Sequence, residues 1–155
     1  MRFETPFGPA WAAIDTEGAL TEFGFREIEA PPARNAMMES QINDFFAGKR
    51  KTFDFPLAPT GTAFQRRVWA ELLKIPFAET ISYGELARRV GNPAASRAVG
   101  RANGVNPIAV IVPCHRVIGA NGKLTGYAGG LDLKGKLLTW ERALAGVPLS
   151  QGCFA

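Results

Sequence analysis

The fold is decided by Ser82–Gly104, which reads SYGELARRVGNPAASRAVGRANG. Ser82 and Glu85 stand three residues apart, the spacing of a capping box, in which two side chains bond backbone amides at the start of a helix. This spacing predicts a short helix that begins after Ser82 and runs to about Val90.

A second short helix should follow almost at once. Asn92 can cap its N-terminus, and Pro93 can take its first position, where the amide hydrogen that proline lacks would have no partner. The helix should run to about Ala102 and stop at Asn103-Gly104. Two short helices joined by a three-residue turn are typical of a helix-turn-helix, although an ordinary helical hairpin has the same pattern.

The surface of the second helix is slim and basic. Arg97 and Arg101 lie four residues apart on one face. Small residues occupy the positions around them: Ala94, Ala95, Ala98 and Gly100. Small side chains let a helix backbone come close to a nucleic-acid groove, and arginines supply phosphate or groove contacts. These features favour a DNA-binding helix, while the ordinary hairpin stays open on this segment alone.

The chain ahead of this segment predicts a small α+β domain without chemistry of its own. Residues 1–29 hold short β-like pieces separated by turns. Ala33–Ala47 has the apolar spacing of a helix, and KTFDF, Lys51–Phe55, has the composition of one more strand. The N-terminal part contains neither histidine nor cysteine. We therefore expect a structural domain over residues 1–58.

The segment PLAPTGT, Pro56–Thr62, has the composition of a linker. Thr62 and Gln65 repeat the capping-box spacing, so another helix should start there. Its apolar face would carry Phe64, Val68, Leu72 and Ile75. We expect a second domain over residues 59–155, and it would hold the functional residues.

The only histidine of the chain follows one of its two cysteines, in IAVIVPCHRVIG, Ile108–Gly119. The apolar run IAVIV predicts a short buried strand. Cys114 and His115 would then stand at a strand end, where functional side chains are often displayed. The plain interpretation of the pair is a small buried cysteine beside a surface histidine.

The last helix offers a partner for the histidine. It should run from Asp132 to about Leu144 with its leucines on one face, and Glu141 lies on or beside that apolar stripe. A buried carboxylate is costly unless it has a partner. The partner could be an arginine at the helix edge, or it could be the imidazole of His115, which Glu141 would orient.

Direct bonding between Cys114 and His115 is awkward, because neighbouring side chains of an extended segment point to opposite sides. A water between them would solve this and would let the imidazole take the thiol proton, since the thiolate is the reactive form. The expected relay runs from Cys114 through a water to His115 and Glu141. A cysteine hydrolase built on Cys114 and His115 remains an alternative.

Bulk properties restrict the class of protein. The chain has 155 residues, a formal net charge of +4 and 46% apolar residues. No apolar run approaches the ~18 residues of a membrane span, and the N-terminus carries no export signal, so we expect no membrane partner.

Two distant cysteines favour a cytoplasmic protein, and with one histidine they cannot complete a zinc site, so no metal is expected. Nothing indicates an obligate oligomer, and a monomer is expected.

The segment from Thr62 to Leu144 resembles the O6-alkylguanine-DNA alkyltransferases, also called methylated-DNA–protein-cysteine methyltransferases, of the bacterial stand-alone type. Four motifs occur together in the family's order: the SYG helix start, the RAVG helix, PCHRV and GYAGG. The resemblance implies an α+β fold. A small ribonuclease H-like domain of antiparallel sheet and helix would precede a mostly helical domain with a winged helix-turn-helix-like motif.

The resemblance also implies roles for residues at the reacting centre. Cys114 matches the nucleophile that accepts the alkyl group, and His115 and Glu141 match the relay that activates it through water. Asn106 matches the asparagine that ties the recognition helix to the turn of the cysteine. Tyr83 matches the tyrosine that protonates guanine N3 as the alkyl group leaves.

The residues that touch DNA and the damaged base are implied in the same way. Arg97 matches the arginine that enters the base stack when the damaged nucleotide flips out. The neighbouring contacts in the minor groove would come from Ala95, Ser96, Ala98, Gly100 and Arg101. The pocket for the flipped base would be lined by Tyr127, Ala128, Val117 and Gly129. The sequence departs from the family where Ala128 replaces the serine of some relatives and Ala78 a frequent glycine.

The implied reaction is the direct reversal of damage in double-stranded DNA. The alkyl group of O6-alkylguanine, mainly O6-methylguanine with O4-methylthymine as a further candidate, passes to the Cys114 sulfur in one displacement, without a cofactor. The thioether product has no carbonyl for water to attack, so we infer that the chain acts once and is consumed. The second hypothesis is a non-enzymatic protein that binds alkylated DNA; such relatives replace the acceptor cysteine, which is present here.

Overall fold

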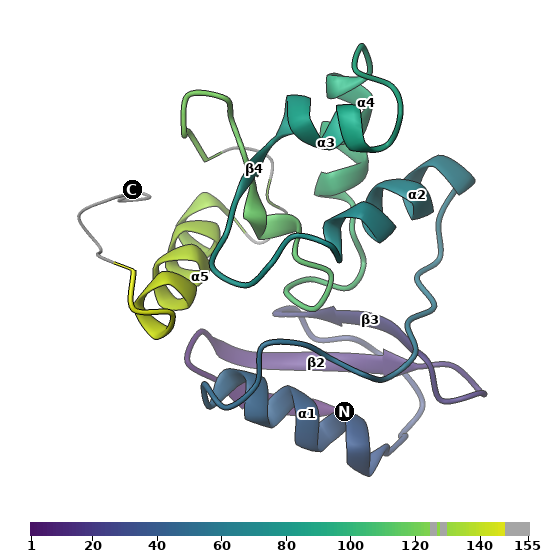
Figure 1. Cartoon of the computed structure of the whole chain (residues 1–155). Helices are drawn as coiled ribbons and strands as arrows, with labels where there is room; N and C mark the ends of the chain where they lie inside the picture. The colour runs from purple at the N-terminus through teal and green to yellow at the C-terminus, as the bar shows by residue number, and fades with distance from the viewer. Residues whose placement is uncertain (125–126, 128–129, 148–155) are drawn as a thin grey trace. The chain divides into compact units, whose positions relative to one another are not determined.

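The computed structural model describes residues 1–124, 127 and 130–147, and Figure 1 shows the order of its helices and strands. The chain forms two compact units. The first contains Met1–Thr60 together with Pro107–Ile111, and the second contains Gly61–Asn106 and the chain from Val112 onward.

A three-stranded antiparallel sheet and one helix make up the first unit. The strands β1 (Arg2–Thr5), β2 (Gly8–Ile14) and β3 (Leu20–Gly24) pair in the order β1-β2-β3. Helix α1 (Ala36–Phe46) begins at Asn35, whose side chain accepts a hydrogen bond from the Met38 amide. The rings of Phe23 in β3 and Phe46 in α1 stack 6.1 Å apart, which packs the helix against the sheet.

The predicted strand KTFDF does not form. The amide of Asp54 in this segment donates to the side-chain oxygen of Gln41 in α1 at 2.9 Å instead of pairing with a strand. Phe53 packs against Phe45 of the same helix, with ring centroids 5.1 Å apart. Helix α1 thus supplies a hydrogen-bond acceptor for the backbone of this segment and an aromatic contact for one of its side chains. The segment lies beside the helix as irregular structure and not as a strand.

The predicted strand IAVIV is a buried turn. Its first residues pair briefly with β3, since the Phe23 amide donates to Pro107 and the Ala109 amide donates back to the Phe23 carbonyl. Val110 then takes a φ of 68°, a left-handed conformation that breaks an extended strand. The prediction of burial was correct, because Ile108 and Val110 are both at most 1% exposed. The prediction of a regular strand was wrong.

The second unit is mainly helical, with α2 (Ala63–Leu72), α3 (Tyr83–Arg89), α4 (Ser96–Gly104) and α5 (Leu131–Leu144). The capping box predicted at Thr62 is present in full at the start of α2. Of the second predicted capping box, the structure shows one half: the Glu85 amide donates to the Ser82 hydroxyl, whereas the Glu85 carboxylate accepts from Arg88 and Arg89. None of the helices in the described part of the chain has the length and apolar character needed to cross a bilayer.

Helix α4 begins three residues later than predicted, at Ser96. Asn92 belongs to the end of α3 instead: its amide donates to the Ala87 carbonyl, and the amide of Gly91, at a φ of 85°, donates to Arg88. This pair of bonds is a Schellman motif, which closes a helix through a left-handed glycine. The Ala95 amide then donates to Asn92 in a turn, so Pro93 lies in the connection and not in the helix.

A small parallel pair of strands brings two distant segments together. β4 (Ile81–Ser82) leads into α3, and β5 (Val117–Ile118) follows the 3₁₀ helix η1 (Cys114–Arg116). Ile81 pairs with Val117 in this register. The pairing sets the start of α3 beside the turn that carries the cysteine.

Candidate active site

Cys114 opens η1 and is buried, with 5% of its surface exposed. The sequence predicted an extended segment here, and the structure corrects this to a 3₁₀ turn. Its first bond runs from the Arg116 amide to the Pro113 carbonyl at 3.0 Å. With three residues per turn, neighbouring side chains still diverge by about 120°. Cys114 and His115 therefore face different surroundings, and any coupling between them is indirect.

The Glu141 carboxylate of α5 is fully buried and accepts four hydrogen bonds. His115 Nε2 lies 2.6 Å from Oε2. Arg116 contacts both oxygens, Nε to Oε1 and Nη2 to Oε2, each at 2.9 Å. The Ala78 amide donates to Oε1 at 3.1 Å. The imidazole is therefore one partner of Glu141, as one alternative predicted, and an arginine is another, although Arg116 comes from the turn of the cysteine and not from the helix edge.

Glu141 and His115 differ in their protonation states. Burial alone would raise the pKa of the Glu141 carboxyl, but His115 and Arg116 together lower that pKa to about 2. Burial lowers the pKa of His115, and this outweighs the opposite effect of Glu141. The carboxylate is thus ionised and the imidazole neutral at pH 7. The second ring nitrogen, Nδ1, is buried and has no hydrogen-bond partner among the described residues.

Two asparagines hold the turn of the cysteine. Asn106 Nδ2 donates to the Val112 carbonyl at 2.8 Å, and its side chain also bonds the Cys114 sulfur. Asn103, on α4, is 1% exposed, and its Nδ2 donates to the Cys114 carbonyl at 3.2 Å. The sequence pattern assigned Asn103 only to a helix stop. Its place at the end of a helix gave no sign that the side chain points inward.

Lys134 is, with Arg116, one of two buried charges in this cluster that the sequence analysis did not predict. It is fully buried on α5, and its Nζ donates to the Val117 carbonyl at 2.5 Å and to the Tyr83 hydroxyl at 3.4 Å. The sequence did indicate this burial, because Lys134 lies four residues before Leu138 and seven before Glu141, which places it on the buried face of the helix.

The same lysine acts electrostatically on the cysteine. Burial raises the pKa of the Cys114 thiol, and the Asn106 hydrogen bond and the Lys134 charge offset only part of that increase. Burial lowers the pKa of Lys134 to about 8, so the ammonium is still mostly charged at pH 7. The resting thiol is therefore protonated and requires a base before it can act as a nucleophile.

The predicted base-pocket residues are only partly described. Val117 is fully buried, and its carbonyl is the acceptor for Lys134. The Tyr127 hydroxyl is buried and makes no hydrogen bond within residues 1–124, 127 and 130–147. Burial raises the pKa of this phenol well above its ordinary value, and Tyr127 lies close enough to Cys114 for their charges to interact. Ala128 and Gly129 lie outside the described residues.

Helix α4 exposes the two arginines that the sequence analysis predicted on its DNA-binding face. Arg97 and Arg101 are exposed, while Val99, Ala102 and Asn103 face the interior. The half-buried small residues of its start and middle are Ala95, Ser96, Ala98 and Gly100. Gly100 packs on the Tyr83 ring, since a Cβ there would lie 3.7 Å from Tyr83 Cδ1. The helix thus contacts the start of α3 on one side and presents arginines on the other.

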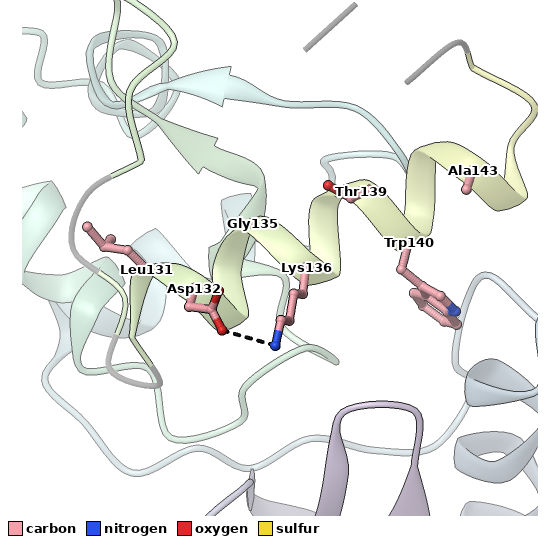
Figure 2. A pocket seen from close by; sticks show the side chains of 7 residues that line it. All are labelled: Leu131, Asp132, Gly135, Lys136, Thr139, Trp140 and Ala143. Atoms are coloured by element: carbon pink, nitrogen blue, oxygen red, sulfur yellow. Dashed lines mark ion pairs between the residues drawn. The ribbon is translucent and has the colours of Figure 1, made fainter. Parts of the chain in front are cut away.

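An open hollow of about 520 Å³ lies along α5, away from these groups. Figure 2 labels its seven lining residues, all from α5 between Leu131 and Ala143, and marks the Asp132–Lys136 ion pair. None of the predicted site residues lines it. In the described part of the chain, no group of three or more His, Cys, Asp and Glu side chains could hold a metal ion.

Known proteins match the chain over nearly its whole length. The methylated-DNA–protein-cysteine methyltransferase of Methanosarcina acetivorans is 54% identical over 148 residues, 90% of this chain and 95% of the relative. The crystal structure of Mycobacterium tuberculosis O6-methylguanine methyltransferase superposes with a TM-score of 0.81 at 45% identity, covering 96% of this chain and 95% of that one. The crystal structure of Mycobacterium tuberculosis OGT in complex with DNA gives a TM-score of 0.82 at 45% identity, with 99% and 98% covered.

The family model described as "6-O-methylguanine DNA methyltransferase, DNA binding domain" matches residues 63–143, which include α2 to α4, the cysteine turn and Glu141. These comparisons confirm the α+β fold that the four sequence motifs implied. On the family model and the 54% identical relative together, the chain belongs to the 6-O-methylguanine DNA methyltransferase family.

Proposed function

We propose that this chain repairs alkylated DNA by moving the alkyl group of O6-alkylguanine onto its own Cys114. The observation that carries the proposal is the buried cluster around one cysteine: Cys114 adjoins His115, and His115 Nε2 lies 2.6 Å from the ionised Glu141 carboxylate. The cluster has a nucleophile, a neutral base and a group that orients the base, which together suit nucleophilic catalysis. Relatives of the chain carry the name of this activity.

The first step is removal of the thiol proton. The resting thiol is protonated, because burial raises its pKa. His115 Nδ1 is the ring nitrogen left to accept a proton, since Nε2 is engaged by Glu141. The two side chains diverge along the 3₁₀ turn, so we route the proton through one water between Sγ and Nδ1. The imidazolium that forms is stabilised by the adjacent carboxylate.

The second step is a single displacement. The thiolate attacks the alkyl carbon, the carbon–sulfur bond forms as the carbon–O6 bond breaks, and the electron pair remains on the guanine. Tyr83 donates its phenol proton to guanine N3, and its hydroxyl lies 3.4 Å from the Lys134 ammonium, which stabilises the phenolate left behind. The product is a thioether and not a hydrolysable ester, so each chain reacts once.

The DNA would bind along α4. The exposed Arg97 and Arg101 provide positive charge, and the small residues between them allow the helix close to the minor groove. Because the lesion lies inside the duplex, the nucleotide must flip out before Cys114 can reach it, and Arg97 would fill the gap in the stack. Tyr127 and Val117, with Ala128 and Gly129, would enclose the flipped base. The protein would act as a monomer in the cytoplasm.

The test is the intact mass of the protein after incubation with duplex DNA that contains one O6-methylguanine. We expect a gain of one methyl group per chain, mapped to Cys114 and not to Cys153, and no gain for the Cys114→Ser variant. Tight binding of the DNA without a mass gain would favour the damage-binding alternative. Repeated turnover of an ester or amide would point to a hydrolase.

A further inference from the structure

Arg116 is a buried arginine with all of its guanidinium edges engaged. It is 6% exposed, and Nε and Nη2 contact the two oxygens of Glu141 at 2.9 Å each. Nη1 donates to the Ile75 carbonyl at 2.8 Å, and the guanidinium carbon lies 5.6 Å from the centre of the Phe77 ring. A forked guanidinium held on both sides has a fixed orientation toward the carboxylate.

The short contact between His115 Nε2 and Glu141 Oε2 holds one hydrogen, and two protonation states of the pair can supply it. In the first, the hydrogen belongs to Nε2, Glu141 is a carboxylate and Nδ1 keeps a lone pair. In the second, the pair has taken up one more proton from solvent: Glu141 is a neutral acid that donates to Nε2, and the ring hydrogen is on Nδ1. Only the first arrangement lets Nδ1 accept a proton, so the base function of His115 depends on which arrangement is populated.

Arg116 distinguishes these two arrangements because its charge is permanent. A neutral Glu141 would leave the buried guanidinium without a counter-ion, which is strongly unfavourable. The Ala78 amide adds a fourth donor at Oε1, 3.1 Å away, so every acceptor position of the carboxylate faces a donor. Lys134 and Arg116 both disfavour a second proton on the imidazole. The surroundings therefore favour a neutral ring with its hydrogen on Nε2.

We propose that Arg116 is a positioning residue that fixes the tautomer of His115: by keeping Glu141 ionised, it holds the ring hydrogen on Nε2 and leaves Nδ1 as the acceptor. The tautomer itself follows from the geometry of the three side chains. Its importance for alkyl transfer rests on the proposed function, in which Nδ1 receives the thiol proton. Arg116 touches neither the thiol nor the base and acts only through Glu141.

The single histidine of the chain makes the tautomer directly measurable. In a protein with ¹⁵N-labelled histidine, two-bond ¹⁵N–¹H correlation spectra distinguish a nitrogen that carries hydrogen from one with a lone pair. At pH 7 the unmodified protein should show a hydrogen on Nε2 and a lone pair on Nδ1. A hydrogen on Nδ1, alone or together with one on Nε2, would overturn the proposal without any variant.

Three variants test the role of Arg116. Arg116→Met removes the charge, Arg116→Lys keeps a charge without the fork, and Arg116→Met with Glu141→Gln removes both partners of a buried pair, which proteins tolerate better than the loss of one. We expect a mixture of tautomers in Arg116→Met and the Nε2–H form in Arg116→Lys. The double variant has no carboxylate to ionise and controls for loss of the buried pair itself. Should Arg116→Met fail to fold, the spectrum of the unmodified protein decides. A folded Arg116→Met that keeps the Nε2–H form alone would contradict the proposal.

Reaction kinetics supply the second measurement. With free O6-benzylguanine, Arg116→Met should lower the rate constant at saturation about tenfold or more and leave the half-saturating concentration unchanged, with partial rescue in Arg116→Lys. The control is Arg34→Met in the first unit, whose side chain is 84% exposed and pairs with Glu39; it should react normally. If the unmodified protein accepts no alkyl group, the proposed function fails while the spectrum still decides the tautomer. Normal kinetics for folded Arg116→Met would overturn the inference alone.

Discussion

The Nζ atom of Lys134 lies 3.4 Å from the Tyr83 hydroxyl, although 51 residues separate the two. The parallel pairing of β4 with β5 creates this contact, because it sets the residue before Tyr83 beside Ile118 while the Val117 carbonyl binds the same ammonium. The lysine is therefore adjacent both to the proposed proton donor and, electrostatically, to the Cys114 thiol. One buried charge thus serves both ends of the proposed displacement.

Lys134→Met should slow transfer of the benzyl group from O6-benzylguanine about tenfold or more, since it removes the cation that stabilises both the thiolate and the tyrosine anion. The pKa of the Cys114 thiol should rise, because the Lys134 charge lowers it. Both effects can be measured from the rate of thiol modification against pH and from the time course of the intact mass.

The matched control for that change lies two residues further along α5. Lys136 pairs with Asp132 at 3.1 Å, and its side chain is 65% exposed. Lys136→Met removes the same charge from the surface of the same helix and should leave the thiol pKa and the reaction rate at their normal values. Equal slowing in both variants would show that the effect comes from net charge and not from the place of Lys134.

Glu141→Gln should lower the free energy of unfolding and reduce the further loss of stability that acidification causes. The pKa of Glu141 is about 2 in the folded chain and 4.5 in the reference state, so the unfolded chain binds more protons between these values. The stabilisation is present above pH 4.5 and is lost as the pH falls toward 2, and it amounts to about 3 kcal/mol. The variant lacks this contribution and should lose less stability than the unmodified protein between pH 5 and pH 3.

Urea unfolding of both proteins at the two pH values provides the measurement. At pH 5 the variant should be less stable by about 3–5 kcal/mol, because the Arg116 charge is left buried without its counter-ion. Glu85, whose pKa Arg88 and Arg89 lower to about 2, is common to both proteins and cancels in the comparison. Parallel loss of stability on acidification would exclude Glu141 as the source.

Local patterns predicted the parts of the fold that neighbours in sequence determine. The caps at Thr62 and Ser82 formed as expected because a hydroxyl and an amide three residues apart need no other part of the chain. The predicted cap at Asn92 failed, because the end of α3 competes for the same residue and Gly91 favours the Schellman motif. Helix ends are decided by such competition, which a single pattern does not reveal.

Predictions that depended on tertiary partners were less complete. KTFDF has the composition of a strand, but Gln41 binds its backbone, and no local signal shows this. Glu141 was found because a carboxylate within an apolar stripe requires a partner. Arg116 was missed because nothing in PCHRV distinguishes a buried arginine from a surface one, and only the fold brings it to Glu141. The sequence thus predicted the reacting residues and the partner of the histidine, but it did not predict the buried charges that set their protonation states.

Ala78→Gly should stabilise the protein by roughly 0.5–1 kcal/mol. Ala78 takes a φ of 67°, a left-handed conformation that costs a side-chain-bearing residue about 1–2 kcal/mol, and glycine relieves this strain at a smaller cost in unfolded-state entropy. Its amide must keep this orientation to bond Glu141 Oε1. Ala78→Val, with a branched side chain, should be destabilising. Chemical denaturation of the three proteins tests the order, and a less stable glycine variant would contradict it.

Arg97→Ala should impair repair of duplex DNA far more than reaction with free O6-benzylguanine. Arg97 is exposed on α4 and takes no part in the hydrogen bonds around Cys114, so its loss leaves the chemistry of the thiol intact. Filling the gap left by a flipped base is needed only in DNA, and losing that contact should cost the duplex reaction about 1–3 kcal/mol, or ~5- to 150-fold in rate. Second-order rate constants for both substrates, measured by intact mass, give the ratio directly. Arg97→Lys should restore part of the duplex rate through its charge, and an equal loss on both substrates would place Arg97 in the thiol chemistry instead of in base flipping.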